Sequence, residues 1–144
     1  KIFTPLTIYP VFHILSIFYN TSLAGTTIFL EGSPIQLISA CIAGSAYFLL
    51  LLLNLTTPMP LKKRIYTLTF SIAAFLILNI IRISAFSALF LSNFTLFNLV
   101  HLSSWYVLST LFVVLIWLAE IKIFKIHKIP IYSDIKFILN LRKR

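Results

Sequence analysis

Apolar residues fill four long stretches of the chain, and turns or basic residues separate one stretch from the next. The stretches are residues 6–23, 40–55, 65–89 and 98–119. A helix of about 20 apolar residues covers the hydrocarbon core of a bilayer, which is about 30 Å thick. Because a chain inside lipid must satisfy its own backbone hydrogen bonds, the pattern predicts about four transmembrane helices.

A different pattern separates the first two stretches. Within residues 26–39, apolar positions such as Ile28 and Leu30 alternate with polar ones on either side of Gly32-Ser33-Pro34. Alternation around a turn is typical of a hairpin. We therefore expect a short hairpin or bent loop at the outer membrane surface, and this segment leads directly into Cys41.

Basic residues lie between or after the apolar stretches. The chain has 12 Lys and Arg against 3 Asp and Glu, and the basic residues gather at 62–64, 122–128 and 136–144. Such clusters are typical of the cytoplasmic flanks of membrane proteins, so the charge does not indicate nucleic-acid binding. Both strongly basic loops follow even-numbered stretches, which predicts that residues 24–39 and 92–97 lie outside.

The composition agrees with this pattern. Hydrophobic residues make up 60% of the 144 residues, and only 10% are charged, whereas a soluble domain carries about 25% charged residues. The sequence therefore predicts an all-α integral membrane protein with a transmembrane domain over residues 1–128. Residues 129–144 are expected to form a basic amphipathic tail on the cytoplasmic surface.

Three residues with charged or reactive side chains fall at a similar expected depth. Arg82 is the only charge between Ile65 and Leu91, and Cys41 and His101 lie near the starts of two other stretches. At about 1.5 Å per helical residue, each lies about 27–32 Å from a basic flank, near the outer face. A charge at the centre of a membrane costs about 2.5–3.5 kcal/mol, so we expect Arg82 to face protein or water and to have a partner.

A thiol, a guanidinium and an imidazole at one depth permit nucleophilic chemistry. The Cys41 thiolate is a nucleophile, and a nearby Arg82 would favour it or would stabilise an oxyanion. His101 could act as a general acid or base near neutral pH. Asn79 shares a helix face with Arg82, and Ser104 shares one with His101, because residues three apart are neighbours on a helix.

Each of these residues also has a simpler interpretation. A lone cysteine in an apolar helix is usually a small hydrophobe, and an arginine near a membrane face can extend toward the head groups. The chain would then be a non-enzymatic transporter or channel component, or a scaffold subunit. No metal or cofactor is expected, because one cysteine and one outer histidine are too few ligands for zinc. Glu31 and Glu120 are expected to be solvated.

At these positions the chain resembles the exosortase/archaeosortase family of membrane-embedded cysteine transpeptidases. The resemblance covers residues 28–118, and the matching pieces are Ala40-Cys41, Pro58, Arg64, the run from Asn79 to Ile83, and His101. It implies that Cys41 is the nucleophile, Arg82 the essential arginine and His101 the third polar residue. Many relatives carry glycine two residues after the cysteine, where this chain has Ala43. Ser45, a further candidate supporting residue, makes this region more similar to the archaeal form.

The resemblance also implies a substrate. Members of the family process exported proteins whose C-terminal signal contains a short motif, a transmembrane helix and a basic tail. Cys41 would attack a peptide bond of the motif at the outer face of the plasma membrane and form a thioester. The acyl group would then pass to an amine acceptor such as a lipid head group. An oligomer is compatible with this prediction, because four helices can need a second copy to shield the site.

Overall fold

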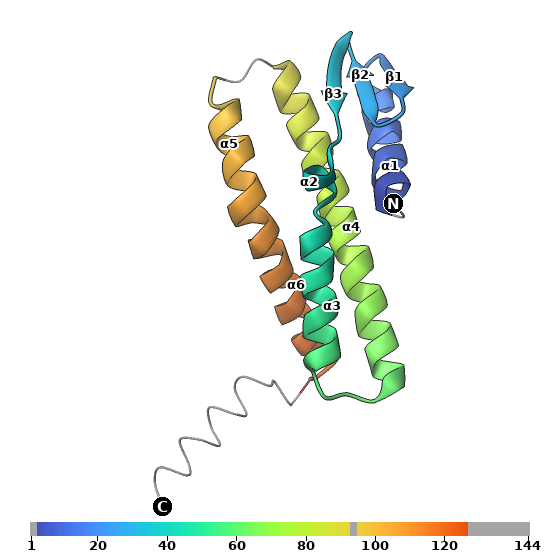
Figure 1. The fold of residues 1–144 in the computed structure, drawn as a ribbon, viewed down its shortest axis with the longest axis vertical. Helices are drawn as coiled ribbons and strands as arrows, with labels where there is room; N and C mark the ends of the chain where they lie inside the picture. The colour runs from blue at the N-terminus through green and yellow to red at the C-terminus, as the bar shows by residue number, and fades with distance from the viewer. Residues whose placement is uncertain (1–2, 93–94, 127–144) are drawn as a thin grey trace, which may run out of the picture.

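The computed structural model describes residues 3–92 and 95–126. Within them the chain forms one helix, then three strands, then a series of helices (Figure 1). The elements are α1 (Phe3–Phe18), β1 (Thr21–Ala24), β2 (Thr27–Leu30), β3 (Ser33–Gln36), α2 (Ser39–Ile42), α3 (Gly44–Thr56), α4 (Leu61–Leu91), α5 (Phe97–Ser103), the π-helical segment η1 (Ser104–Leu108) and α6 (Ser109–Ile123).

The long helix α4 organises the fold. Helices α1, α3 and α6 all pack against it, and α3 also packs against α6. Figure 1 shows the sheet and α1 beside one end of α4, while the connection from α3 into α4 lies at the other end. The core consequently has two parts. Apolar residues of α1, the sheet and α4 form the first, and those of α3, α4 and α6 form the second.

The strands form an antiparallel sheet in the order β1-β2-β3. Leu30 pairs with Ser33, which leaves Glu31 and Gly32 as a two-residue turn. Both turn residues have positive φ angles, 48° and 82°, as a type I′ turn requires. A hairpin is therefore present within residues 26–39, where the alternating pattern predicted one. The strand β1, which precedes it, was not predicted.

The prediction of an all-α protein with about four transmembrane helices is wrong. Among the described residues only α4 is long and apolar enough to cross a membrane, and a three-stranded sheet is present. The stretch 6–23 does not form one spanning helix, because α1 ends at Phe18 and residues 21–24 pair with β2. The β-branched Thr21 suits a strand, and Gly25 allows the turn into β2 with a φ of 64°.

Two other stretches are apolar but are not continuous α-helices. The stretch 40–55 is divided at Ala43, whose φ of 54° and ψ of 47° end α2 before α3 begins. The stretch 98–119 is divided into α5, η1 and α6. Apolar composition predicts that a segment is buried in protein or inserted in a membrane, but it does not predict where a helix ends. The predicted tail, residues 129–144, lies outside the described residues.

A buried polar cluster joins the helices of the second core. Glu120 was expected to be solvated, but its side chain is fully buried, with 0% exposure. Its carboxylate accepts hydrogen bonds from the Ser71 hydroxyl and from the Asn54 amide, the latter at 3.2 Å. One residue from each of α3, α4 and α6 therefore meets in this cluster. Glu31 is exposed as expected, and its carboxylate accepts a hydrogen bond from the Asn20 backbone at 2.9 Å.

Glu120→Gln is expected to make the protein more stable at pH 8 and to remove a pH dependence. Burial is the main reason that the pKa of the Glu120 carboxyl is raised above its ordinary value. A raised pKa means that the folded state binds the proton more tightly than the unfolded state. Stability is therefore greatest below the ordinary pKa and is lost as the pH rises through the raised one.

Thermal unfolding followed by circular dichroism at pH 4 and pH 8 measures this effect. The glutamine variant should melt a few degrees above the wild type at pH 8 and close to it at pH 4. Glu31→Gln, a change at an exposed carboxylate, is the matched control and should leave the difference between the two pH values unchanged. A glutamine variant that melts below the wild type at pH 8 would show that the charged carboxylate stabilises the fold.

Candidate functional site

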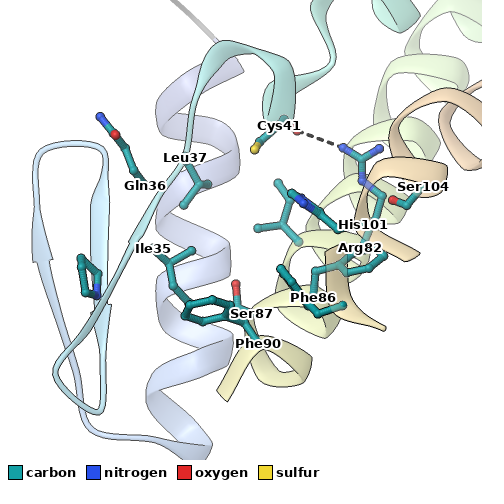
Figure 2. Close-up of a pocket in the computed structure, with 13 residues that line it drawn as sticks. Ile35, Gln36, Leu37, Cys41, Arg82, Phe86, Ser87, Phe90, His101 and Ser104 are labelled. Carbon is teal, nitrogen blue, oxygen red and sulfur yellow. Dashed lines mark hydrogen bonds between the residues drawn. The ribbon is translucent and has the colours of Figure 1, made fainter. Parts of the chain in front are cut away.

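A cavity lies where β3, α2, α4 and α5 meet, at the end of the molecule that carries the sheet (Figures 1 and 2). Its volume is about 160 Å³, which is enough for a group of roughly the size of benzene. Apolar side chains supply most of the lining, and the polar residues in it are Gln36, Cys41, Arg82, Ser87, His101 and Ser104. Cys41, Arg82 and His101 come from three separate helices.

The short helix α2 presents Cys41 to this cavity. The chain leaves β3 at Gln36 and enters α2 at Ser39, so only two residues connect the strand to the helix. Ala43 ends α2 in the left-handed conformation, and its N–H donates to the carbonyl of Ala40. Cys41 is half-buried, and Figure 2 shows its sulfur facing the space between β3 and α4.

Arg82 connects α4 to the elements on both sides of it. One amino group donates to the backbone carbonyl of Cys41 at 3.2 Å (Figure 2), and the other donates to the hydroxyl of Ser109. Asn79, one turn earlier, donates to the same Cys41 carbonyl at 3.0 Å. Arg82 is only 7% exposed. The expectation that Arg82 faces protein and has a partner is confirmed, and the two donors fix the backbone at Cys41.

His101 lies in α5 on the other side of the cavity. Its ring stacks on Phe97, with centroids 5.2 Å apart, and lies 5.4 Å from the ring of Phe86. Burial, and secondly the positive charge of Arg82, lower the pKa of His101 below its ordinary value. A lowered pKa favours the neutral imidazole at neutral pH, and the neutral ring is the form that can accept a proton.

Two serines of the following helical segment also belong to the site. Ser104 lines the cavity and is 5% exposed, and its hydroxyl has no hydrogen-bond partner among the described residues. Ser109 binds Arg82, and its hydroxyl also donates to the Ser104 carbonyl at 3.5 Å. Ser104 begins η1 and Ser109 follows it, and π-helical turns are frequent at functional sites. Ser109 was not predicted to belong to the site, because the π-helical turn in η1 shifts the register of the residues that follow it.

Ser45 was predicted to support the site, but the structure does not place it there. Its side chain is exposed, and it is not part of the cavity lining. The prediction assumed that Ser45 lies one turn after Cys41 on a continuous helix. The left-handed Ala43 breaks that helix and turns the chain, so residues on the two sides of it do not share a face.

Ala43→Gly removes the steric cost of about 1–2 kcal/mol that a Cβ atom carries in the left-handed conformation. It also removes a methyl group that is buried in the second core and makes the unfolded chain more flexible, so the two effects should largely cancel. Ala43→Val should destabilise it, since a β-branched residue fits this conformation poorly. Denaturant unfolding of the purified chain measures both effects. Ala73→Gly, at an exposed position within α4, is the control and should destabilise by about 1 kcal/mol. An Ala43→Val variant that unfolds at the same denaturant concentration as the wild type would contradict the argument.

Within residues 3–92 and 95–126, no three side chains of His, Cys, Asp or Glu gather into a group that could hold a metal ion. The chemistry available at the cavity is that of a thiol, an imidazole, a guanidinium and hydroxyl groups.

Comparison of the chain with protein-family models, with curated proteins and with solved structures found no significant match. The resemblance to the exosortase/archaeosortase family therefore stays a prediction from the residues that carry it.

Proposed function

We propose that the chain is a cysteine transpeptidase of the exosortase/archaeosortase type that processes exported proteins at a membrane. The observation that carries the proposal is that Cys41, Arg82 and His101 line one cavity although they lie in three different helices. The resemblance implies a function for the same three residues. A nucleophile, a proton acceptor and a fixed positive charge are the parts that acyl transfer through a thioester requires.

In the first proposed step, His101 accepts the proton of the Cys41 thiol, and the sulfur attacks the carbonyl carbon of a substrate peptide bond. A C–S bond forms and the peptide C–N bond breaks, and the leaving nitrogen takes the proton from His101. The C-terminal helix and basic tail of the substrate are released as an amine. The N-terminal part stays on the enzyme as a thioester of Cys41.

In the second step, an amine acceptor attacks the carbonyl carbon of the thioester. A C–N bond forms, the C–S bond breaks, and a proton of the amine returns through His101 to the sulfur. Arg82 stabilises the negative charge that develops beside Cys41 in both steps. The apolar walls, which include Phe86 and Phe97, exclude water and so allow the amine to compete with hydrolysis.

The surface and charge of α4 support a membrane location. The helix has 31 residues, and exposed large apolar side chains along it include Ile65, Ile77 and Ile81. An extensive apolar surface requires lipid or a partner to cover it. We propose that α4 crosses the plasma membrane. Its basic first turn, residues 62–64, marks the cytoplasmic side, so the cavity at the opposite end lies outside.

The hydrogen bonds of Arg82 fit the part that this function gives it. Both of its amino groups donate to protein acceptors, the Cys41 carbonyl and the Ser109 hydroxyl. Because a guanidinium carries five N–H donors, these two bonds leave others that can face a developing oxyanion. Arg82 is thus arranged to hold Cys41 in place and to supply a fixed charge.

Deletion of the gene in the organism that carries it tests the proposal. Mass spectrometry of C-terminal peptides should find a group of exported proteins that keep an apolar C-terminal helix and basic tail only in the deletion strain. The wild-type gene should restore processing, and so should Ser45→Ala, which changes an exposed residue outside the cavity. Identical C-termini in the wild-type and deletion strains would contradict the proposed function.

A further inference from the structure

The outer edge of β3 adjoins the cavity. In the described part of the chain β3 pairs only with β2, so its other edge is free. Four consecutive residues, 34–37, line the cavity together with Cys41. Successive side chains of a strand point to opposite faces. A cavity that contacts all four residues therefore runs along the edge of the strand rather than against one face.

The pairing with β2 determines which backbone groups face this edge. Leu37 donates its N–H to the carbonyl of Thr26, directly opposite, at 2.9 Å. Hydrogen-bonded pairs alternate with non-hydrogen-bonded pairs along an antiparallel ladder. Gln36 therefore turns its N–H and its C=O away from β2, toward the free edge. Pro34 lies two residues earlier and is also in a non-hydrogen-bonded pair, so its missing N–H costs the sheet no hydrogen bond. Its C=O also faces the free edge.

We propose that an extended segment of the substrate polypeptide binds along this edge as a fourth strand, with its scissile bond at Cys41. The inference rests on the proposed function, because the added strand is the peptide that Cys41 cleaves. Strand addition obtains affinity from backbone hydrogen bonds and specificity from pockets for the side chains. Here the edge offers three backbone groups, and the cavity beside it has apolar walls and room for one side chain.

The connection from β3 to α2 explains how such a strand reaches the nucleophile. Only residues 37 and 38 separate the strand from the helix that holds Cys41. A peptide that pairs with Gln36 and extends beyond it along the line of β3 reaches α2, whichever way its chain runs. In an antiparallel arrangement, the residue opposite Gln36 exchanges two hydrogen bonds with it, and the residue opposite Pro34 only donates. The substrate must therefore carry an N–H at both positions.

Labelling of Cys41 by two vinyl sulfones tests this inference. The first is a mixture of capped tetrapeptidyl vinyl sulfones with varied side chains, and the second is ethyl vinyl sulfone, which has the same reactive group without a peptide. The full chain is purified in detergent, and mass spectrometry follows the rate of labelling at Cys41. In the wild type, the peptidyl probes should label at least about tenfold faster, which corresponds to about 1.4 kcal/mol of binding.

Gln36→Pro removes the outward N–H and leaves the pairing with β2 intact. It should reduce the ratio between the labelling rates of the peptidyl probes and of ethyl vinyl sulfone about tenfold. Thr21→Pro makes the same change at the other edge of the sheet, where Thr21 is likewise one residue from a hydrogen-bonded pair, Asn20 with Glu31. This control should label like the wild type.

A second measurement does not depend on the folding of any variant. Peptidyl probes that are methylated on their backbone nitrogens should label the wild-type chain about tenfold more slowly than the unmethylated probes. Equal rates for both kinds of probe, or for wild type and Gln36→Pro, would overturn strand addition and leave the proposed function standing. Peptidyl probes that label Cys41 no faster than ethyl vinyl sulfone would overturn the proposed function and this inference with it.

Discussion

Cys41→Ala is expected to abolish processing of exported proteins, with a loss of rate of at least about 10⁴-fold, as for other enzymes that lose their nucleophile. Alanine has no group that can form the thioester. The structure makes this variant informative, because Arg82 and Asn79 bind the backbone carbonyl of Cys41 and not its sulfur. Those contacts are available to alanine as well, so the loss should come from chemistry and not from unfolding.

The measurement is complementation of the deletion strain, with C-terminal peptides of exported proteins as the readout. Cys41→Ser should also fail, because a serine hydroxyl at neutral pH is a far weaker nucleophile than a thiolate. Circular dichroism of the purified alanine variant should match that of the wild type. Normal processing by Cys41→Ala would eliminate the transpeptidase proposal and would favour a scaffold or transport role.

The polar residues of the candidate site were more predictable than the fold that carries them. For Arg82 the distance was estimated on the assumption of one continuous helix, and α4 is continuous from its basic first turn onward. For Cys41 and His101 the assumption of continuous helices is wrong. Both still reach the cavity, because α2 lies at the end of α3, and α5 lies at the end of α6, on the same side of the molecule (Figure 1). When two helical segments follow each other in the same direction, a break between them changes the position of a residue along their common axis only a little.

The direction in which a side chain points around its helix could not be predicted in the same way. Ser45 lies outside the site because the left-handed Ala43 interrupts the helix, and Ser109 belongs to the site because a π-helical turn precedes it. An alanine such as Ala43 and an apolar segment such as η1 contain no sequence pattern that predicts such a change of register. Glu120 was misjudged for a related reason. Its position beside basic residues suggested a surface, but only packing showed that it faces Ser71 and Asn54.

Arg82 should also prove necessary for processing, and its two roles can be separated. Arg82→Ala removes the charge beside the nucleophile and one of the two hydrogen bonds to the Cys41 carbonyl, so processing should fall by at least about 10³-fold. Arg82→Lys keeps the charge but cannot bond in a planar fork to Cys41 and Ser109 at once, and it should recover only part of the rate. Lys62→Ala, an exposed change at the other end of α4, is the control.

A purely structural role for Arg82 would predict the same loss of rate, so the decisive measurement is the titration of His101. The charge of Arg82 contributes to the lowered pKa of His101, although burial contributes more. In Arg82→Ala the pKa of His101 should therefore rise part of the way to its ordinary value, which NMR of the imidazole ring can follow.

A proton acceptor with a higher pKa becomes protonated at higher pH. Residual activity should then begin to fall, as the pH is lowered, at a higher pH than in the wild type. Arg82→Lys should keep the titration of His101 close to that of the wild type. If His101 titrates identically in all three proteins, Arg82 acts on the site through packing alone, and its electrostatic role in the transfer reaction is wrong.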